Sequence, residues 1–178
     1  NLEPSSYHPD TAIDLLYEAG WDDADEDGIL DKQIDVERIP FRFEILVNSG
    51  NQLRKDIALV VQAELADIGI DCQVRELDWS IFLQRADTQD FDALVLGWTG
   101  NVRFPPDAYQ IWHSSQAEGQ GSNFITFVND EVDSILEEYR REFDPDRRIA
   151  LYQRFQEILH EQQPYTFLWK QRLATSYA

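Results

Sequence analysis

The chain is poor in cysteine, in basic residues and in long apolar runs. Cys72 is the only cysteine among 178 residues, so no disulfide can form within the chain, and we expect a buried thiol. No apolar run reaches the roughly 18 residues of a membrane-spanning helix, and we find no signal peptide. Only 15 residues are Lys or Arg against 34 acidic ones, which gives a formal net charge of −19. Because DNA, RNA and anionic lipids are bound through basic clusters, we expect no nucleic-acid partner.

Apolar residues are plentiful, at 43% of the chain, and five Trp, seven Tyr and ten Phe are among them. This content suffices for a sizeable core, so the sequence predicts one compact domain over residues 1–178. Strand-like and helix-like segments alternate along most of it. That alternation predicts an α/β fold, a mixed sheet flanked by helices on both faces.

The expected elements follow from hydrophobic periodicity and from capping signals. Helices are predicted over residues 9–19, 52–68, 79–85, 129–142 and 144–162, with a further helix starting near Pro105. Strands are predicted over residues 41–47, 70–77, 91–97, 124–128 and 165–169.

The strands at 41–47 and 91–97 end abruptly in polar loops. In open α/β sheets, ligands bind beyond the carboxyl ends of strands, and ligand pockets combine aromatic rings with a few polar groups. If these two strands are neighbours, their loops face one cleft. The alternative is that Trp98 only packs against the edge of the sheet and has no role in binding. The predicted ligand-binding residues are Asn48, Ser49, Gly50 and Asn51 in the first loop, and Trp98, Thr99, Gly100 and Asn101 in the second.

An acidic loop follows the first helix and matches most of a calcium-binding pattern. Its ligand positions 1, 3, 5 and 9 are Asp23, Asp25, Asp27 and Asp31, and the glycine of the sharp turn is Gly28. Position 12, where a bidentate Glu closes such sites, is Ile34. The loop is therefore interpreted either as a structural calcium site or as a solvated acidic turn.

No catalytic constellation is visible in the sequence. The three histidines, His8, His113 and His160, are scattered, and the zinc-protease, nucleophile-elbow and phosphate-loop motifs are absent. His113 is interpreted as a helix-end cap, because no nucleophile accompanies it. We therefore predict a binding protein and not an enzyme, with a hydrolase that uses paired carboxylates as a remote alternative.

Several short motifs in order carry a family resemblance over almost the whole chain. They include G-W-T-G at 97–100, P-D-A-Y at 106–109, H-S-S-Q at 113–116, V-Q-A-E-L-A-D-I-G-I-D at 61–71 and N-D-E-V-D at 129–133. Together they resemble the dipeptide- and oligopeptide-binding class of ABC-transporter substrate-binding proteins, extracellular solute-binding protein family 5.

This resemblance implies that the chain is the C-terminal lobe of a two-lobed, type II periplasmic-binding-protein-like fold, without its N-terminal lobe. It also implies an extracytoplasmic protein that captures a peptide or similar solute, delivers it to an ABC permease and ATPase complex, and requires no cofactor. A secreted calcium-binding interaction module is the alternative from another class.

The resemblance further implies two charged ligand contacts that this sequence does not reproduce. Peptide-binding relatives carry an Asp at the place of Asn101 for the ligand ammonium, and short-peptide binders carry an Arg near Asn48 for the carboxylate. A neutral amide loses the charge-assisted part of such hydrogen bonds. We therefore expect a longer peptide held through its backbone, or a neutral solute such as an oligosaccharide stacked on Trp98.

The excess of carboxylates also suggests a salt-loving source, in which dense counterions screen the repulsion among acidic side chains. We predict that the melting temperature rises between low and molar concentrations of sodium chloride, as followed by circular dichroism. An unchanged melting temperature would leave only an acidic surface without adaptation to salt.

Overall fold

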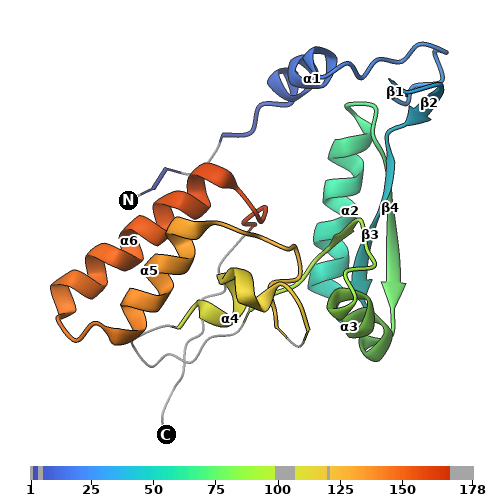
Figure 1. Ribbon diagram of the computed structural model, residues 1–178. Coiled ribbons are helices and arrows are strands. Elements are labelled where there is room, and N and C mark those ends of the chain that lie inside the picture. Colours follow the sequence, from blue (N-terminus) through green and yellow to red (C-terminus); the bar gives the residue numbers. More distant parts are fainter. Residues whose placement is uncertain (1, 4–5, 99–106, 120, 169–178) are drawn as a thin grey trace, which may run out of the picture. The chain divides into compact units, whose positions relative to one another are not determined.

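The computed structural model describes residues 2–3, 6–98, 107–119 and 121–168 (Figure 1). Its contacts divide the chain into two compact units, one formed by Glu3–Phe104 and the other by Pro105–Ala178 together with Asn1–Leu2. Each unit has its own hydrophobic core. The strands of the described residues all lie in the first unit, and the second is built from helices and turns.

A three-stranded sheet organises the first unit. Its central strand β3 (Arg42–Asn48) pairs in parallel with β4 (Asp71–Leu77) on one side and with the short strand β5 (Ala93–Leu94) on the other. Helix α2 (Gln52–Ala66) connects β3 to β4, and helix α3 (Trp79–Asp87) connects β4 to β5. Parallel neighbours require such crossover connections, which explains the alternation of strands and helices along the sequence.

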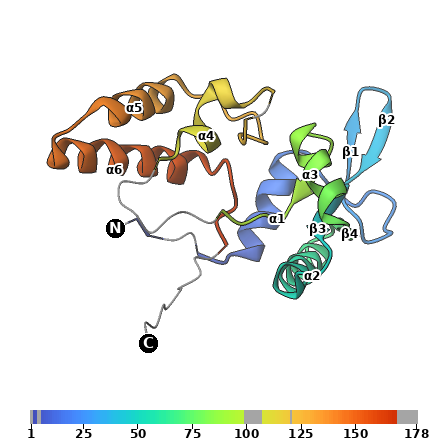
Figure 2. The same cartoon turned by 90° about the horizontal axis from the view of Figure 1, so that it is seen from below.

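Successive side chains of β3 point alternately to the two faces of the sheet. Ile45 and Val47 pack with Ala58 of α2 in one core cluster, whereas Leu46 lies on the opposite face and is 1% exposed. Helix α3 lies on this second side of the sheet (Figure 2) and contributes the fully buried Phe82. The predicted α/β fold, with helices on both faces of a sheet, is confirmed.

Cys72 on β4 belongs to the cluster beneath α2 and is 3% exposed. Burial is the main cause that raises the pKa of its thiol, because the thiolate would lose its hydration. The predicted buried structural thiol is therefore confirmed.

The start of the first unit holds an element that the sequence did not predict. After α1 (Pro9–Glu18), strands β1 (Asp31–Ile34) and β2 (Glu37–Pro40) form an antiparallel hairpin. Its turn places Asp35 at φ +52°, a left-handed conformation that Asp adopts more readily than most residues. The buried Asp31 carboxylate pairs with Arg38, which crosses the hairpin and also contacts Asp22.

Two long helices, α5 (Asp130–Arg141) and α6 (Pro145–Gln162), dominate the second unit, and the shorter α4 (Tyr109–Trp112) precedes them. Asn129 accepts a hydrogen bond from the backbone N–H of Val132, and Asp144 accepts from the first turn of α6. These caps satisfy backbone donors that a helix start leaves without partners. The predicted helices at 9–19, 52–68, 79–85, 129–142 and 144–162 are all confirmed, with small differences at their ends.

Two predicted strands are wrong in this unit. Residues 124–128 form no strand, because a turn places Thr126 at φ +55° and the side chain of Asn123 binds the backbone of Phe127. Asn123 is 1% exposed, and its amide also donates to the carbonyl of His113 at 3.3 Å. The described part of the predicted strand 165–169 is likewise irregular. In the first unit, the predicted strand 91–97 is shortened to Ala93–Leu94.

None of the helices within the described ranges combines the length and the apolar character needed to cross a bilayer.

Candidate functional site

The loops after β3 and β5 leave the sheet at the same edge. The two strands are parallel neighbours, and the register continues as the N–H of Val95 donates to the carbonyl of Leu46 at 3.0 Å. Their carboxyl ends therefore point the same way. Asn48 is the last residue of β3, and Trp98 comes shortly after β5. The predicted adjacency of the two strands is confirmed. Of the second loop, Trp98 is described, while Thr99, Gly100 and Asn101 lie outside the described residues.

Trp98 is 43% exposed. Aromatic rings of this kind are common in the lining of ligand pockets.

The first loop combines polar groups with a built-in helix start. Asn48 is half-buried, and its amide donates to the carbonyl of Ser49 at 3.1 Å. Gly50 adopts φ +77°, a conformation that suits glycine because it lacks Cβ. The side chain of Asn51 accepts from the backbone N–H of Arg54 at 3.1 Å and so caps α2. The side chain of Asn51 therefore has a structural role, the capping of α2, that is independent of any ligand.

Strand β4 brings further polar groups to this edge, because it too is parallel to β3. The N–H of Ser49 donates to the carbonyl of Leu77 at 2.7 Å, and its hydroxyl lies 3.4 Å from a carboxylate oxygen of Asp78. Asp78 and Trp79 then begin α3. Trp79 is 48% exposed and stacks on Phe82 with ring centroids 5.7 Å apart. Sequence reasoning missed both residues, because it treated the segment only as the start of a helix.

Arg54 is another residue that the sequence did not single out. Its Nη1 donates to Oδ1 of Asn48 at 2.6 Å, and its Cζ lies 6.0 Å from the ring centroid of Trp79. Burial lowers the pKa of the guanidinium, since it loses part of its hydration. A positive charge therefore lies beside Asn48, and it comes from a helical side chain six positions further along the chain.

The acidic loop brings three of its four predicted metal ligands together. Carboxylate oxygens of Asp23, Asp25 and Asp27 lie within 4.8 Å of one another, and Asp23 also accepts from the backbone N–H groups of Asp27 and Gly28 at 3.1 and 3.0 Å. Asp31 is not part of this cluster, because its carboxylate pairs with Arg38. Burial, reinforced by the charge of Asp25, raises the pKa of Asp31.

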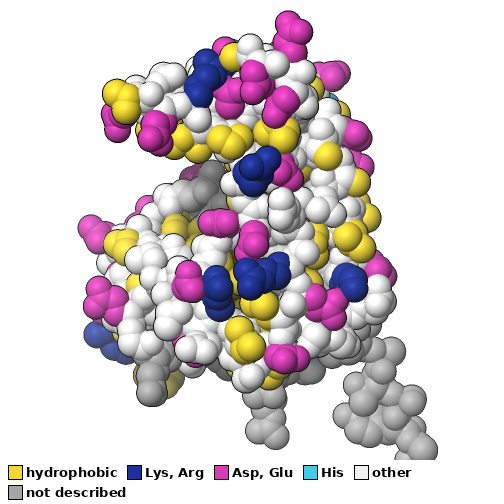
Figure 3. All heavy atoms as spheres, turned by 90° about the vertical axis from the view of Figure 1, so that its right-hand side faces the viewer, with side chains coloured by type: hydrophobic (Ala, Val, Ile, Leu, Met, Phe, Trp, Pro, Cys, Tyr) yellow, Lys and Arg dark blue, Asp and Glu magenta, His cyan; other side chains and the backbone are white. Residues whose placement is uncertain are grey.

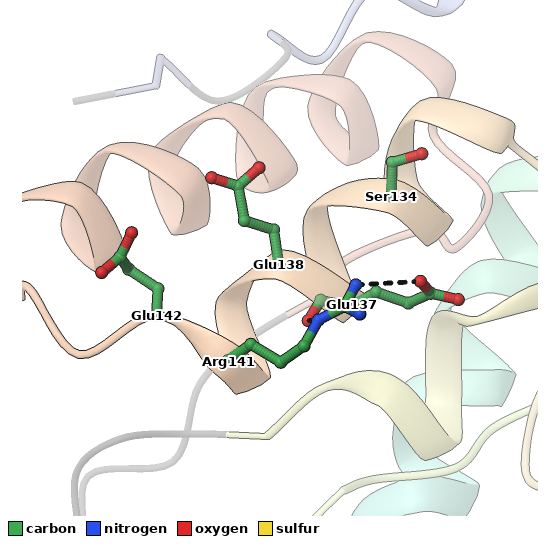
Figure 4. A pocket seen from close by; sticks show the side chains of 5 residues that line it. All are labelled: Ser134, Glu137, Glu138, Arg141 and Glu142. Carbon is green, nitrogen blue, oxygen red and sulfur yellow. Dashed lines mark hydrogen bonds and ion pairs between the residues drawn. The ribbon is translucent and has the colours of Figure 1, made fainter.

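A hollow in the second unit is lined by Ser134, Glu137, Glu138, Arg141 and Glu142 (Figure 4). All five belong to α5 or directly follow it, and Arg141 turns toward Glu137 to form an ion pair at 3.2 Å. A hollow along one helix, lined by five polar or charged residues and no aromatic ring, has the character of a solvated helix face and not of a ligand pocket.

His113 precedes this helix in the chain and is 7% exposed. Its Nδ1 accepts from the backbone N–H of Ser115 at 3.1 Å, its ring stacks on Tyr109, and its Nε2 lies 3.6 Å from Glu137. His113 is the residue at which α4 ends, as predicted, but its side chain caps the start of the turn that follows and not the end of α4.

Acidic side chains are spread over the face seen in Figure 3, and basic side chains lie among them instead of forming one large patch. In the first unit, ion pairs join acidic and basic side chains, including Arg75 with Glu44 at 3.3 Å and Lys55 with Glu76 at 2.9 Å. The pairing with Lys55 lowers the pKa of Glu76 and raises that of Lys55. This mixed surface does not resemble the basic footprint of a nucleic-acid-binding protein.

A parallel sheet covered by helices, with aromatic and polar groups at its carboxyl edge, is an architecture that solute-binding lobes share with other ligand-binding α/β proteins. The sequence comparison agrees and is more specific. Residues 1–120 match the family model "Bacterial extracellular solute-binding proteins, family 5 Middle", and the chain belongs to this family.

Among its relatives, the oligopeptide-binding protein AppA of Bacillus subtilis is 37% identical over 165 residues, which cover 92% of this chain and 29% of AppA. The structure of AppA in complex with a nonapeptide matches with a TM-score of 0.79 at 38% identity, over 90% of this chain and 31% of that one. An oligopeptide-binding protein from Thermus thermophilus, complexed with a pentapeptide, matches with a TM-score of 0.79 at 26% identity, over 92% and 30%. The chain thus spans less than a third of these relatives.

We predict that Asn51→Ala lowers the free energy of unfolding by about 1 kcal/mol, because it removes the cap of α2. Asn51→Asp serves as the control, since its carboxylate also accepts from the backbone N–H. Urea denaturation of both variants measures the difference. An equal loss in the two variants, or none in either, would contradict the capping role.

Proposed function

We propose that this chain is part of the substrate-binding component of an ABC importer, and that it contributes one wall of a peptide-binding cleft. The observation that carries the proposal is the edge shared by two parallel neighbouring strands: Asn48 ends β3 and Trp98 comes shortly after β5, in a chain that belongs to solute-binding family 5. Carboxyl edges of parallel strands are where open α/β sheets bind ligands.

Both units would belong to the second lobe of a two-lobed protein, with the first lobe encoded in the rest of the gene. A ligand that touches both lobes stabilises the hinge-closed state, because its contacts are complete only there. The closed form then docks on the permease and ATPase complex outside the cytoplasm. No chemical step is needed for this role, and we assign none.

A peptide is the favoured ligand. AppA and the Thermus thermophilus protein are described as oligopeptide-binding, and their structures hold a nonapeptide and a pentapeptide. In this chain, the exposed rings of Trp79 and Trp98 offer apolar faces, while Asn48 and Ser49 offer polar groups that suit a peptide backbone. A neutral oligosaccharide stacked on Trp98 is the alternative that the same aromatic ring allows.

We also propose a structural calcium ion in the acidic loop. Support comes from the gathered carboxylates of Asp23, Asp25 and Asp27, since alternate carboxylates around one point suit a hard cation with oxygen ligands. Its role would be to hold the loop between α1 and β1, and not to bind the transported solute.

Replacing the exposed indole tests the binding cleft. In the full-length protein, we expect Trp98→Ala to weaken binding of a randomised peptide pool about five- to tenfold by calorimetry, because an aromatic contact is lost. Phe143→Ala is the control, since Phe143 is 93% exposed and lies in the loop between α5 and α6. Binding of an oligosaccharide panel in place of peptides would select the alternative ligand, and an unchanged affinity of Trp98→Ala for both would sink the cleft assignment.

Calcium binding is tested by thermal melting. If the loop holds calcium, a concentration about a hundred times the dissociation constant stabilises the fold by about 2.7 kcal/mol. Asp25→Asn should abolish the calcium-dependent rise in melting temperature, while Glu26→Gln, the same change of charge in the same loop, should keep it. The absence of any rise in the wild type at millimolar calcium, with magnesium as reference, would leave the loop a solvated turn.

A further inference from the structure

Arg148 lies near the start of α6 and is half-buried. The other arginines in the described part of the second unit each pair with a carboxylate, in the pairs Arg140–Asp107, Arg141–Glu137, Arg147–Glu138 and Arg154–Glu131. The carboxylate of Glu142 is also engaged by Arg147, at 3.0 Å. Within the described structure, the contact given for the Arg148 guanidinium is the ring of Tyr139, and no carboxylate pairs with it.

The hydroxyl of Tyr139 lies on this same pair of side chains and is also unpaired. Tyr139 is 4% exposed, and the Cζ of Arg148 is 4.4 Å from its ring centroid. Among the described residues, the Tyr139 Oη and the Arg148 Nε are both buried and form no hydrogen bond. Buried donors are nearly always paired in native proteins, because an unpaired donor loses its hydration without compensation. Two such donors on contacting side chains indicate a site for an acceptor.

The chemistry of the site favours an anion as that acceptor. A guanidinium is permanently charged, and a partly buried charge is stabilised most by an opposite charge. A second phenol, that of Tyr152, has its ring centroid 5.6 Å from that of Tyr139, and burial raises its pKa, so it is a neutral hydroxyl. The side chain of Arg148 also lies near the N-terminal end of α6, where the helix dipole favours negative charge.

We propose that Tyr139 and Arg148 bind a small inorganic anion of the chloride type between α5 and α6, which lie side by side (Figure 1). The Tyr139 hydroxyl and the Arg148 Nε–H both donate to it, and the guanidinium supplies the counter-charge. The ion is small, because Tyr139 is enclosed by the packing and only the long Arg148 side chain can move to admit it. Such an ion fastens α5 to α6, so the stability of the fold depends on which anion is present.

The experiment measures melting temperatures of the full-length protein in sodium chloride and in sodium isethionate, at equal concentration and pH. Isethionate is a bulky sulfonate, and the cation that screens the surface carboxylates is the same in both solutions. We expect the wild type to melt about 2–4 °C higher in chloride, the shift produced by binding at several times the dissociation constant. Tyr139→Phe and Arg148→Met should lose this difference. Arg141→Gln, a change at an exposed and paired arginine, should keep it.

Tyr139→Phe also provides a test by the sign of its effect. It removes only the hydroxyl and keeps the ring that contacts the guanidinium. If the hydroxyl has no acceptor, its removal leaves the melting temperature unchanged or raises it in both salts. If the anion binds, the variant melts below the wild type in chloride and not in isethionate.

Crystals of the full-length protein grown in sodium bromide locate the ion, because bromide scatters X-rays anomalously. We expect an anomalous peak within hydrogen-bond distance of the Tyr139 Oη and the Arg148 Nε. A wild type that melts equally in both salts, a Tyr139→Phe variant that keeps the chloride-dependent difference, or a site that holds only water overturns the inference.

Discussion

Parallel pairing of β3 with its two neighbours is the constraint on which the first unit depends. It requires the crossover helices α2 and α3, and their packing then buries both faces of the sheet. It also turns the carboxyl ends of three strands toward one edge. Residues that are about 50 positions apart in the sequence, Asn48 and Trp98, thereby reach the same edge of one sheet. The order of the strands in the sheet, and not any short-range sequence pattern, brings these two residues to one edge.

Periodicity was sufficient to predict most of this unit and both long helices of the other. Apolar stripes and capping residues such as Asn129 and Asp144 act locally, so they can be read without knowledge of the fold. The hairpin β1–β2 was missed because its strands are short and largely exposed, and because its turn uses Asp35 in place of the usual glycine. The predicted strand at 124–128 failed because a buried side chain, that of Asn123, takes over the hydrogen bonds of the local backbone.

The sequence predicted where the candidate site lies, but it did not predict that a positively charged side chain lies there. Strand ends followed by Asn, Gly and Trp indicated where the edge lies, but Arg54 reaches it from a helix, and its orientation depends on the hydrogen bond with Asn48. Trp79 was similarly hidden as the first residue of α3. Conversely, Asn51 looked like a ligand contact in the sequence, and its side chain caps a helix. Contacts between side chains of different helices and strands can be identified only when the positions of those helices and strands are known.

The buried amide of Asn123 has a consequence for a chain with one thiol. It joins the carbonyl of His113 to both backbone groups of Phe127, and thus ties two irregular segments across ten residues of sequence. Small extracytoplasmic domains commonly fasten such segments with a covalent cross-link. Here hydrogen bonds hold the two segments together, and a reducing agent cannot break them. The local structure around Trp112 therefore does not depend on the redox state of its surroundings.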